Sequence, residues 1–253
     1  MVLITGDTHG RFDRLMTLRS LRAGGLRRGD CLIICGDFGG VWFADGQQER
    51  VLDQLARLPY TVLFADGNHE NFDCLETYPV TDWNGGRVQV IRRNVLHLMR
   101  GEIYEIEGKS YFVLGGAASH DLWNGVLDPA SPDFIERYRA LRRRGAFFRV
   151  KGASWWPQEL PSEEELARAW VNLQTHGMAV DVVITHCAPT AVQDMIARKL
   201  QNDTYVPNLL TDFLQLVWDT CRFGAWYCGH YHREMKIGRL RVLHESLVRP
   251  QIG

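Results

Sequence analysis

Gly6-Asp7-Thr8-His9-Gly10 follows directly on the apolar run Met1–Thr5 at the start of this 253-residue sequence. Such a run is typical of a short buried strand, and the pentapeptide brings a carboxylate and an imidazole into the loop behind it. Open α/β sheets carry their chemistry at the carboxyl ends of strands. One Asp-x-His in a loop is a weak signal by itself, so the interpretation depends on whether the pattern returns.

The same arrangement returns four more times, as an apolar run, then small residues, then side chains that can bind a metal ion. These later stretches are Gly36-Asp37-Phe38-Gly39-Gly40, Gly67-Asn68-His69-Glu70, Thr185-His186-Cys187-Ala188-Pro189 and Gly229-His230-Tyr231-His232. Glycine before the ligand lets the backbone turn sharply and approach an ion closely. Mixed oxygen and imidazole donors suit Mn²⁺, Fe or Zn²⁺ better than a calcium cage. Five such strand ends in one chain predict a metal centre.

The apolar runs also predict an α/β fold class. Runs of strand length are Met1–Thr5, Cys31–Cys35, Thr61–Ala65, Tyr111–Leu114, Asp181–Thr185 and Ala225–Cys228. Amphipathic segments over 12–21 and 47–59 separate the first three runs, which is the strand–helix alternation of βαβ units. Between residues 86 and 108 short strands follow one another without helices, which favours a second sheet or an antiparallel edge.

The second half of the chain predicts four helices. The first is expected to have Ser131 as its N-cap and to end at Gly145. The second and third are expected to start at Ser162 and Thr190, with Glu165 and Gln193 as their capping-box partners. The fourth is expected to start at Leu209. No repeat or linker interrupts the chain, so residues 1–253 are expected to form a single domain, with a substrate-side insertion around 118–158.

Composition limits the class of protein. Apolar residues make up 45% of the chain, which is enough for one large core, and the net charge of −1 gives no global field that attracts nucleic acid or an anionic membrane. No apolar run approaches the roughly 20 residues that span a bilayer. The first residues lack a basic region and are predicted to be a strand, not a signal peptide. The six cysteines form no C-x-x-C pair, and buried thiols in a cytoplasmic protein are expected.

In order and spacing, the five stretches from Asp7 to His232 resemble the calcineurin-like metallophosphoesterase superfamily, in particular its bacterial and phage-borne members. The resemblance implies a two-sheet β-sandwich flanked by helices, in four layers (αββα), with metal ions at the strand ends. It implies seven ligands for two ions, namely Asp7, His9 and His232 at the first, Asn68, His186 and His230 at the second, and Asp37 bridging both. His69 would be the general acid that protonates the leaving oxygen.

The reaction that this resemblance implies is hydrolysis of a phosphate ester by a metal-bound hydroxide, without a covalent enzyme intermediate. Two divalent ions about 3.5–4 Å apart hold the phosphate oxygens and generate hydroxide at neutral pH. Mn²⁺ is the preferred ion, with Fe, Zn²⁺, Mg²⁺ or Ni²⁺ as alternatives. Two Asp carboxylates against two such ions leave a formal surplus of about +2, which attracts an anionic ester.

The second stretch departs from that of phosphoprotein phosphatases, which extend it to Gly-Asp-x-x-(Asp or Ala)-Arg and use the Arg to bind the substrate phosphate. Gly40 and Val41 stand at the last two positions here, and Val cannot replace a bidentate phosphate donor. The departure favours phosphodiester or nucleotide substrates. A phosphomonoesterase, including a Ser/Thr protein phosphatase, is the alternative, and a non-catalytic metal-binding scaffold is a further one. The departure also removes the Asp that orients the catalytic His, so the residue that orients His69 stays open.

The region from 115 to 158 carries two more hypotheses. His120 and Asp121 follow the strand end at Gly115-Gly116 and are hypothesised to face the substrate, with ordinary loop residues as the alternative. Seven Arg and Lys residues between 137 and 151 precede Trp155 and Trp156. Positive charge for phosphates and aromatic rings for bases together indicate a binding surface for a nucleotide or nucleic acid. The alternative is that the basic residues form a solvated helix face and the aromatic residues anchor it to the core.

Overall fold

The first of two mixed sheets contains the N-terminal strand. The structure, a computed structural model, describes residues 1–17, 25–43, 45–201 and 205–251. Within these ranges the spatial order of the first sheet is β1 (Val2–Thr5), β2 (Cys31–Ile34), β3 (Thr61–Phe64), β6 (Val95–Leu98), β5 (Gly86–Arg92) and β4 (Val80–Trp83). The four strands β1, β2, β3 and β6 are parallel, and β5 and β4 form an antiparallel edge.

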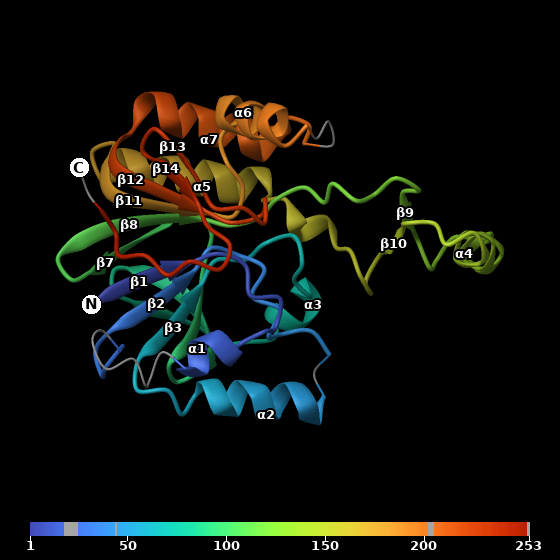
Figure 1. Cartoon of the computed structure of the whole chain (residues 1–253), viewed down its shortest axis with the longest axis horizontal. Helices are drawn as coiled ribbons and strands as arrows, with labels where there is room; N and C mark the ends of the chain where they lie inside the picture. The colour runs from blue at the N-terminus through green and yellow to red at the C-terminus, as the bar shows by residue number, and fades with distance from the viewer. Residues whose placement is uncertain (18–24, 44, 202–204, 252–253) are drawn as a thin grey trace.

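The second sheet lies face to face with the first (Figure 1). Its strands, in spatial order, are β13 (Met235–Ile237), β14 (Leu240–Val242), β12 (Arg222–Cys228), β11 (Ala179–Thr185), β8 (Lys109–Leu114) and β7 (Glu102–Ile106). The four central strands are parallel, and β13 and β7 are antiparallel edges.

Alternation along the strands separates the cores of the sandwich. Ile33 of β2 packs between the two sheets with Val113 and Val182, whereas Leu32 and Ile34 point to the helices outside the first sheet. The helices on that side are α1 (Asp13–Thr17), α2 (Gly46–Leu55) and α3 (Phe72–Leu75). Those over the second sheet are α5 (Glu163–Thr175), α6 (Thr190–Leu200) and α7 (Leu209–Thr220). This confirms the four-layer α/β sandwich.

Residues 118–158, which we call the arm, leave the sandwich after β8 and return before α5. The arm contains β9 (Val126–Leu127), α4 (Phe134–Arg143) and β10 (Arg149–Val150), and it runs into the short helix η2 (Pro157–Glu159). Figure 1 shows the arm extending away from the two sheets, with α4 at its far end. None of the residues of α4 is buried.

Most of the expected strands and helices are present, with differences at their ends and at one edge. Strand β4 was not anticipated, because its residues are mostly exposed and give no apolar run. The helix expected over 12–21 is confirmed as far as Thr17, and residues 18–24 lie outside the described part of the chain. No helix in the described ranges is long and apolar enough to cross a membrane.

Of the predicted helix caps, one is confirmed and two are wrong. Ser162 and Glu165 form the expected capping box at α5. Ser131 is not an N-cap, because α4 begins at Phe134 and the Ser131 hydroxyl donates to Asp133. Helix α6 begins at Thr190, but Gln193 accepts a hydrogen bond from the Tyr231 hydroxyl instead of closing a box. In both cases the side chain forms its hydrogen bond with another residue instead of with the backbone at the start of the helix.

Candidate metal centre

The loops behind the parallel strands of both sheets meet at one edge of the sandwich. The loop after β1 is tied to the loop after β2, where the amide of His9 donates to the Asp37 carbonyl at 2.8 Å. The loops after β11 and β12 are joined in the same way by Gly229 and His186, at 3.0 Å. His186 also crosses between the sheets, because its Nδ1 lies 2.7 Å from the Cys35 carbonyl. Backbone contacts therefore set the spacing of the loops.

Two glycines permit this close approach. A Cβ on Gly67 would lie 2.0 Å from Asp37 Oδ1, and a Cβ on Gly36 would lie 2.1 Å from His186 Nδ1. Gly36 also has φ of +96°, a conformation that side chains with a Cβ rarely adopt. The chain therefore needs glycine at these positions to bring side chains from different loops together.

A first group of donors comes from the loops after β1, β2 and β12. The four ligand atoms all lie within 4.8 Å of one another and belong to Asp7, His9, Asp37 and His232. The Nε2 atoms of His9 and His232 are 3.0 Å apart, and Asp7 Oδ2 is 3.0 Å from the latter. Two carboxylates and two imidazoles form a donor set that suits a divalent transition-metal ion.

A second group lies deeper, around His186. The Cys35 carbonyl can only accept, so Nδ1 of His186 carries a proton and Nε2 is directed at the other ligands. Nε2 is 3.3 Å from Asp37 Oδ1 and 3.2 Å from Asn68 Oδ1. Three atoms that all offer lone pairs converge there. Only a cation, either a proton or a metal ion, can stabilise that arrangement.

The pKa values of this group agree with that conclusion. Burial alone would lower the pKa of His186, but the carboxylates of Asp37 and Asp7 outweigh it and raise the pKa to about 10. Burial likewise opposes ionisation of Asp37, yet His186 in particular holds the pKa of that carboxyl below its usual range. A bound divalent ion would take the place of the proton on Nε2.

His230 and Asp37 connect the two groups. The His230 ring packs edge-on against the ring of His186 with 5.0 Å between centroids, and its amide donates to Asp7 Oδ1 at 2.9 Å. Burial, and then His186, lower the pKa of His230 well below its usual value, so the ring is neutral, as a ligand must be. Asp37 directs Oδ1 to His186 and Oδ2 to His9, at 3.3 and 3.6 Å, and lies between both groups.

Side chains that the sequence did not single out hold these candidate ligands in place. The Asn68 amide donates to Ser119 Oγ at 3.2 Å, and that hydroxyl donates to Glu159 at 2.6 Å. This fixes which way the Asn68 oxygen points. The ring of His244 stacks on His232 with 5.0 Å between centroids. Neither contact has a signal in the sequence, because each joins residues far apart along the chain.

His69 lies at the rim of the first group. Its amide donates to Asp37 Oδ1 at 2.8 Å, and its half-buried ring lies 5.5 Å from that of His9. The two acidic neighbours of His69 in sequence bind elsewhere. Asp66 pairs with Arg100 and His97, and Glu70 accepts from the Phe38 amide at 2.7 Å.

His120 and Asp121 lie in different surroundings although they are adjacent. The His120 ring packs against His230, with 5.3 Å between centroids, and against Tyr205 at 4.9 Å. Asp121 forms an ion pair with Arg149. The structure therefore brings His120 next to the second group and pairs Asp121 with Arg149.

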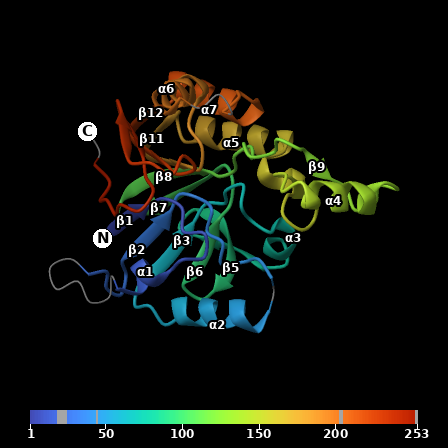
Figure 2. The same cartoon turned by 45° about the vertical axis from the view of Figure 1, so that its right-hand side comes forward.

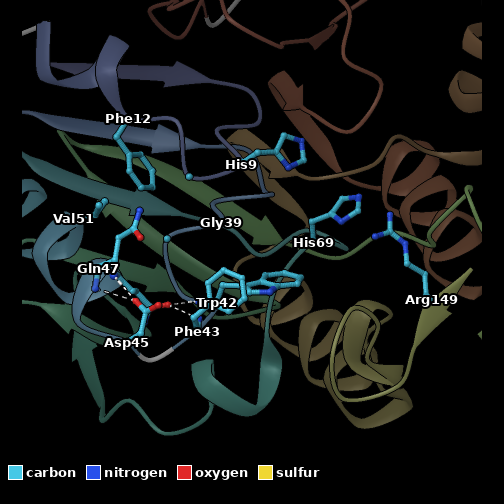
Figure 3. Close-up of a pocket in the computed structure, with 13 residues that line it drawn as sticks. His9, Phe12, Gly39, Trp42, Phe43, Asp45, Gln47, Val51, His69 and Arg149 are labelled. Carbon is cyan, nitrogen blue, oxygen red and sulfur yellow. Dashed lines mark hydrogen bonds between the residues drawn. The ribbon is translucent and has the colours of Figure 1, made fainter. Parts of the chain in front are cut away.

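A cavity of about 570 Å³ opens beside the first group (Figure 3). His9 and His69 line one side, and Trp42 and Phe43 line another. Arg149 reaches the same cavity from the arm, and Figure 3 shows its guanidinium directed toward His69. The cavity therefore combines the metal-binding edge, an aromatic wall and a cation.

Among the basic and aromatic residues of the arm, Trp156 is buried and donates to Asp73 at 2.7 Å. Phe147 is 65% exposed. Trp156 therefore anchors the arm to the core, as the alternative interpretation predicts for the aromatic residues. Binding of a nucleotide or nucleic acid by the basic and aromatic residues stays a hypothesis.

The chain was compared with family models, curated proteins and solved structures. Residues 1–234 match the family model of the calcineurin-like phosphoesterases. Among curated proteins, none matches the chain. A solved structure from Staphylococcus aureus, provisionally described as a 5′-nucleotidase in complex with α-ketoglutarate, is similar with 14% identity and a TM-score of 0.42, over 96% of this chain and 48% of that one. This chain spans about half the length of that protein. Because the family model covers nearly all of the sequence, the chain belongs to the calcineurin-like phosphoesterase family.

Proposed function

We propose that the protein is a binuclear metal-dependent phosphoesterase in which water attacks phosphorus directly. The observation that carries the proposal is the convergence of four donors from Asp7, His9, Asp37 and His232 within 4.8 Å. Asp37 shares its second oxygen with the deeper group around His186 and Asn68. Two adjoining donor groups with one carboxylate between them are what a pair of divalent ions requires.

The residues present fit two Mn²⁺ ions or similar cations. The first ion would be held by Asp7, His9 and His232, the second by Asn68, His186 and His230, and both by Asp37. Bound ions of this kind act as Lewis acids on phosphate oxygens and lower the pKa of a coordinated water.

His69 is the general acid in this proposal. Its half-buried ring borders the cavity beside His9, from which it can donate a proton to the leaving oxygen of an ester. Its amide is fixed by Asp37, so the ring stays at the rim of the metal groups. Cys187 is not suited to nucleophilic catalysis, because burial raises its pKa to about 12 and the thiolate is the reactive form.

We propose phosphodiesters or nucleotides as the substrates. Two observations support this choice over phosphoproteins. Val41, at the position where phosphoprotein phosphatases carry Arg, is buried in the apolar core under the first sheet. The cavity beside His69 has an aromatic wall of Trp42 and the exposed Phe43, against which a planar organic group can stack.

The test is Mn²⁺-dependent hydrolysis of a chromogenic phosphodiester and of the matching monoester, side by side. We expect a preference for the diester, abolished by chelation and strongly reduced in His69→Ala. His176→Ala, which removes an exposed imidazole at the end of α5, is the matched control and should retain full activity. A preference for the monoester would replace the diester proposal by a phosphomonoesterase or protein phosphatase. Metal binding without any turnover would instead favour a non-catalytic scaffold.

A further inference from the structure

Arg149 is an arm residue that reaches the catalytic cavity. It lies on β10, which pairs in parallel with β9 and belongs to neither large sheet. Even so, its side chain lines the cavity together with His9 and His69 (Figure 3). Among the described residues that line this cavity, Arg149 is the only Arg or Lys. It therefore supplies the positive side chain that the cavity otherwise lacks.

Asp121 holds the guanidinium in this direction. Arg149 Nε donates to Asp121 Oδ1 at 3.3 Å, and Nη2 donates to Oδ2. Both contacts use one edge of the planar fork, which leaves the N–H groups of Nη1 for another acceptor. Asp121 is partly exposed, with 39% of its side chain accessible, so water solvates part of its charge while the guanidinium keeps its free N–H donors.

Both ends of the arm are fastened beside the metal-binding edge. At its start, Ser119 contacts Asn68 and Glu159. At its end, Trp156 donates to Asp73 and packs edge-on against Trp42, with 5.5 Å between ring centroids. Because Trp42 itself forms a wall of the cavity, the arm and the cavity share a packed contact, and Arg149 has a defined position relative to His69.

We propose that Arg149 is a substrate-binding residue, which donates to the phosphate oxygens of the bound ester, and that Asp121 positions it. A guanidinium suits this task because it is always charged and offers paired donors to an oxyanion. The arm is then a substrate-side element of the site, which replaces the missing Arg at Val41 from a distant part of the chain. The proposal rests on the proposed function for the identity of the ester, but recognition of the phosphate group can be measured without turnover.

The experiment measures the Kd of inorganic phosphate for the Mn²⁺-loaded protein by calorimetry, with the KM of the chromogenic diester as a second readout. We expect Arg149→Ala to weaken phosphate binding about 10- to 100-fold, the effect of losing charge-assisted hydrogen bonds. Arg149→Lys keeps the charge but not the paired donors, so its Kd for phosphate should lie between those of the wild type and Arg149→Ala. Asp121→Asn should weaken binding about 3- to 10-fold. Mn²⁺ affinity and Tm should stay unchanged in all three, which a merely structural role would not predict.

Arg139→Ala is the matched control, because it removes the same charge from an exposed position on α4. Phosphate binding in this variant should stay within about twofold of wild type. An equal loss in Arg139→Ala and Arg149→Ala would overturn the proposal in favour of a general field of the arm. Unchanged binding in Arg149→Ala would overturn it directly. If Arg149→Ala fails to fold, unchanged binding in both Arg149→Lys and Asp121→Asn would overturn it.

The two proposals fail in different ways. A wild-type protein that binds phosphate through Arg149 but hydrolyses no ester would refute the proposed function and leave this inference intact. A wild-type protein that hydrolyses esters, with Arg149→Ala unchanged in both Kd and KM, would refute only the inference. A Mn²⁺-loaded protein that binds no phosphate would overturn the assignment of Arg149.

Discussion

The metal-binding edge and the arm are built in opposite ways. At the edge, proposed ligands such as Asp37, His186 and His230 are buried, and their loops are held by backbone hydrogen bonds and by glycines that leave no room for a Cβ. In the arm, α4 buries nothing, and Trp123 and Phe147 are 73% and 65% exposed. Figure 2 shows the same contrast, with the helices of the sandwich packed on the sheets and α4 outside them.

The difference shows how each region acts on the site. At the edge, many short-range contacts fix each donor side chain, so any change in backbone spacing would alter the geometry of the proposed metal centre. The arm acts through a few long-range contacts, mainly Asp121 with Arg149, Trp156 with Asp73 and Ser119 with Asn68. Substitutions should therefore have large effects at the edge, intermediate effects where the arm is attached, and small effects at its far end.

The largest effect is expected for Gly67→Ala. The new Cβ would lie 2.0 Å from Asp37 Oδ1 and 2.8 Å from His186 Nε2, so both donor groups must shift. Activity should fall at least about 100-fold, with a parallel loss of Mn²⁺ affinity, measured by turnover and calorimetry. Gly46→Ala is the matched control, because a Cβ there meets nothing within 4 Å. Normal metal binding in Gly67→Ala would show that the edge is less crowded than its distances indicate.

A large effect on stability is expected for Asp66→Asn, where the sandwich meets the base of the arm. Asp66 is buried with Arg100, whose Nη2 also donates to the Gln158 carbonyl at the end of the arm. Removing this carboxylate leaves the buried guanidinium with only the half-buried Glu165 as a counter-charge. Breaking a buried pair in this way costs up to about 3–5 kcal/mol of unfolding free energy. Denaturant unfolding measures this. Asp53→Asn, which weakens an exposed pair with Arg92, should cost less than about 1 kcal/mol.

The same residue predicts a pH dependence. Burial alone would raise the pKa of Asp66, but Arg100 and then His97 lower it below its usual value. A lowered pKa in the folded state contributes stability above the unfolded value of about 3.9 and loses it as the pH falls through the folded pKa. The wild type should therefore lose stability below about pH 4, and Asp66→Asn should lack this part of the loss. Parallel acid-unfolding curves would contradict the assignment.

A moderate effect is expected for Ser119→Ala. Without the hydroxyl, the Asn68 amide loses the acceptor that sets its orientation, and Mn²⁺ affinity should fall about 10-fold. Calorimetric titration of the metal-free protein measures this. Ser110→Ala, at the other end of β8, removes a hydroxyl that bonds to Asp181 and should leave the Mn²⁺ affinity unchanged. Equal affinities in the two variants would exclude Ser119 as a support for the second ion.

The smallest effect is expected at the far end of the arm. Ile135 of α4 is 56% exposed, so Ile135→Ala removes little buried area, and the unfolding free energy should change by less than about 0.5 kcal/mol. Hydrolysis of a small chromogenic ester should also stay unchanged. A clear loss of stability would mean that α4 is packed against something in solution, for example a second copy of the chain.

The sequence indicated which side chains meet at the edge because its signals there are local. Asp7 and Asp37 each stand one glycine after an apolar run that becomes β1 or β2, and parallel pairing then brings those two strand ends together. Each of these loops can be identified from the few residues that follow its own strand in the sequence.

The contacts of the arm have no such local signal. The ion pair of Asp121 with Arg149 was not anticipated, because the two residues lie 28 positions apart and Arg149 was assigned only to a basic cluster. That Asp121 faces the substrate stays a prediction. The helix caps failed for a related reason. The spacing of Gln193 from Thr190 predicts a capping box. In the structure, however, the Gln193 side chain accepts a hydrogen bond from Tyr231, which lies in the loop after β12. Local spacing cannot show which long-range partner a polar side chain will find.

The most direct test of the central claim is the number of Mn²⁺ ions bound per chain, measured by calorimetry together with turnover of the phosphodiester in the same titration. We predict two ions, with activity that follows occupancy of both, and a loss of both binding and activity in Asp37→Asn, whose carboxylate lies between the two donor groups. Full activity with one ion or none, or unchanged binding in Asp37→Asn, would contradict a binuclear centre at the strand ends.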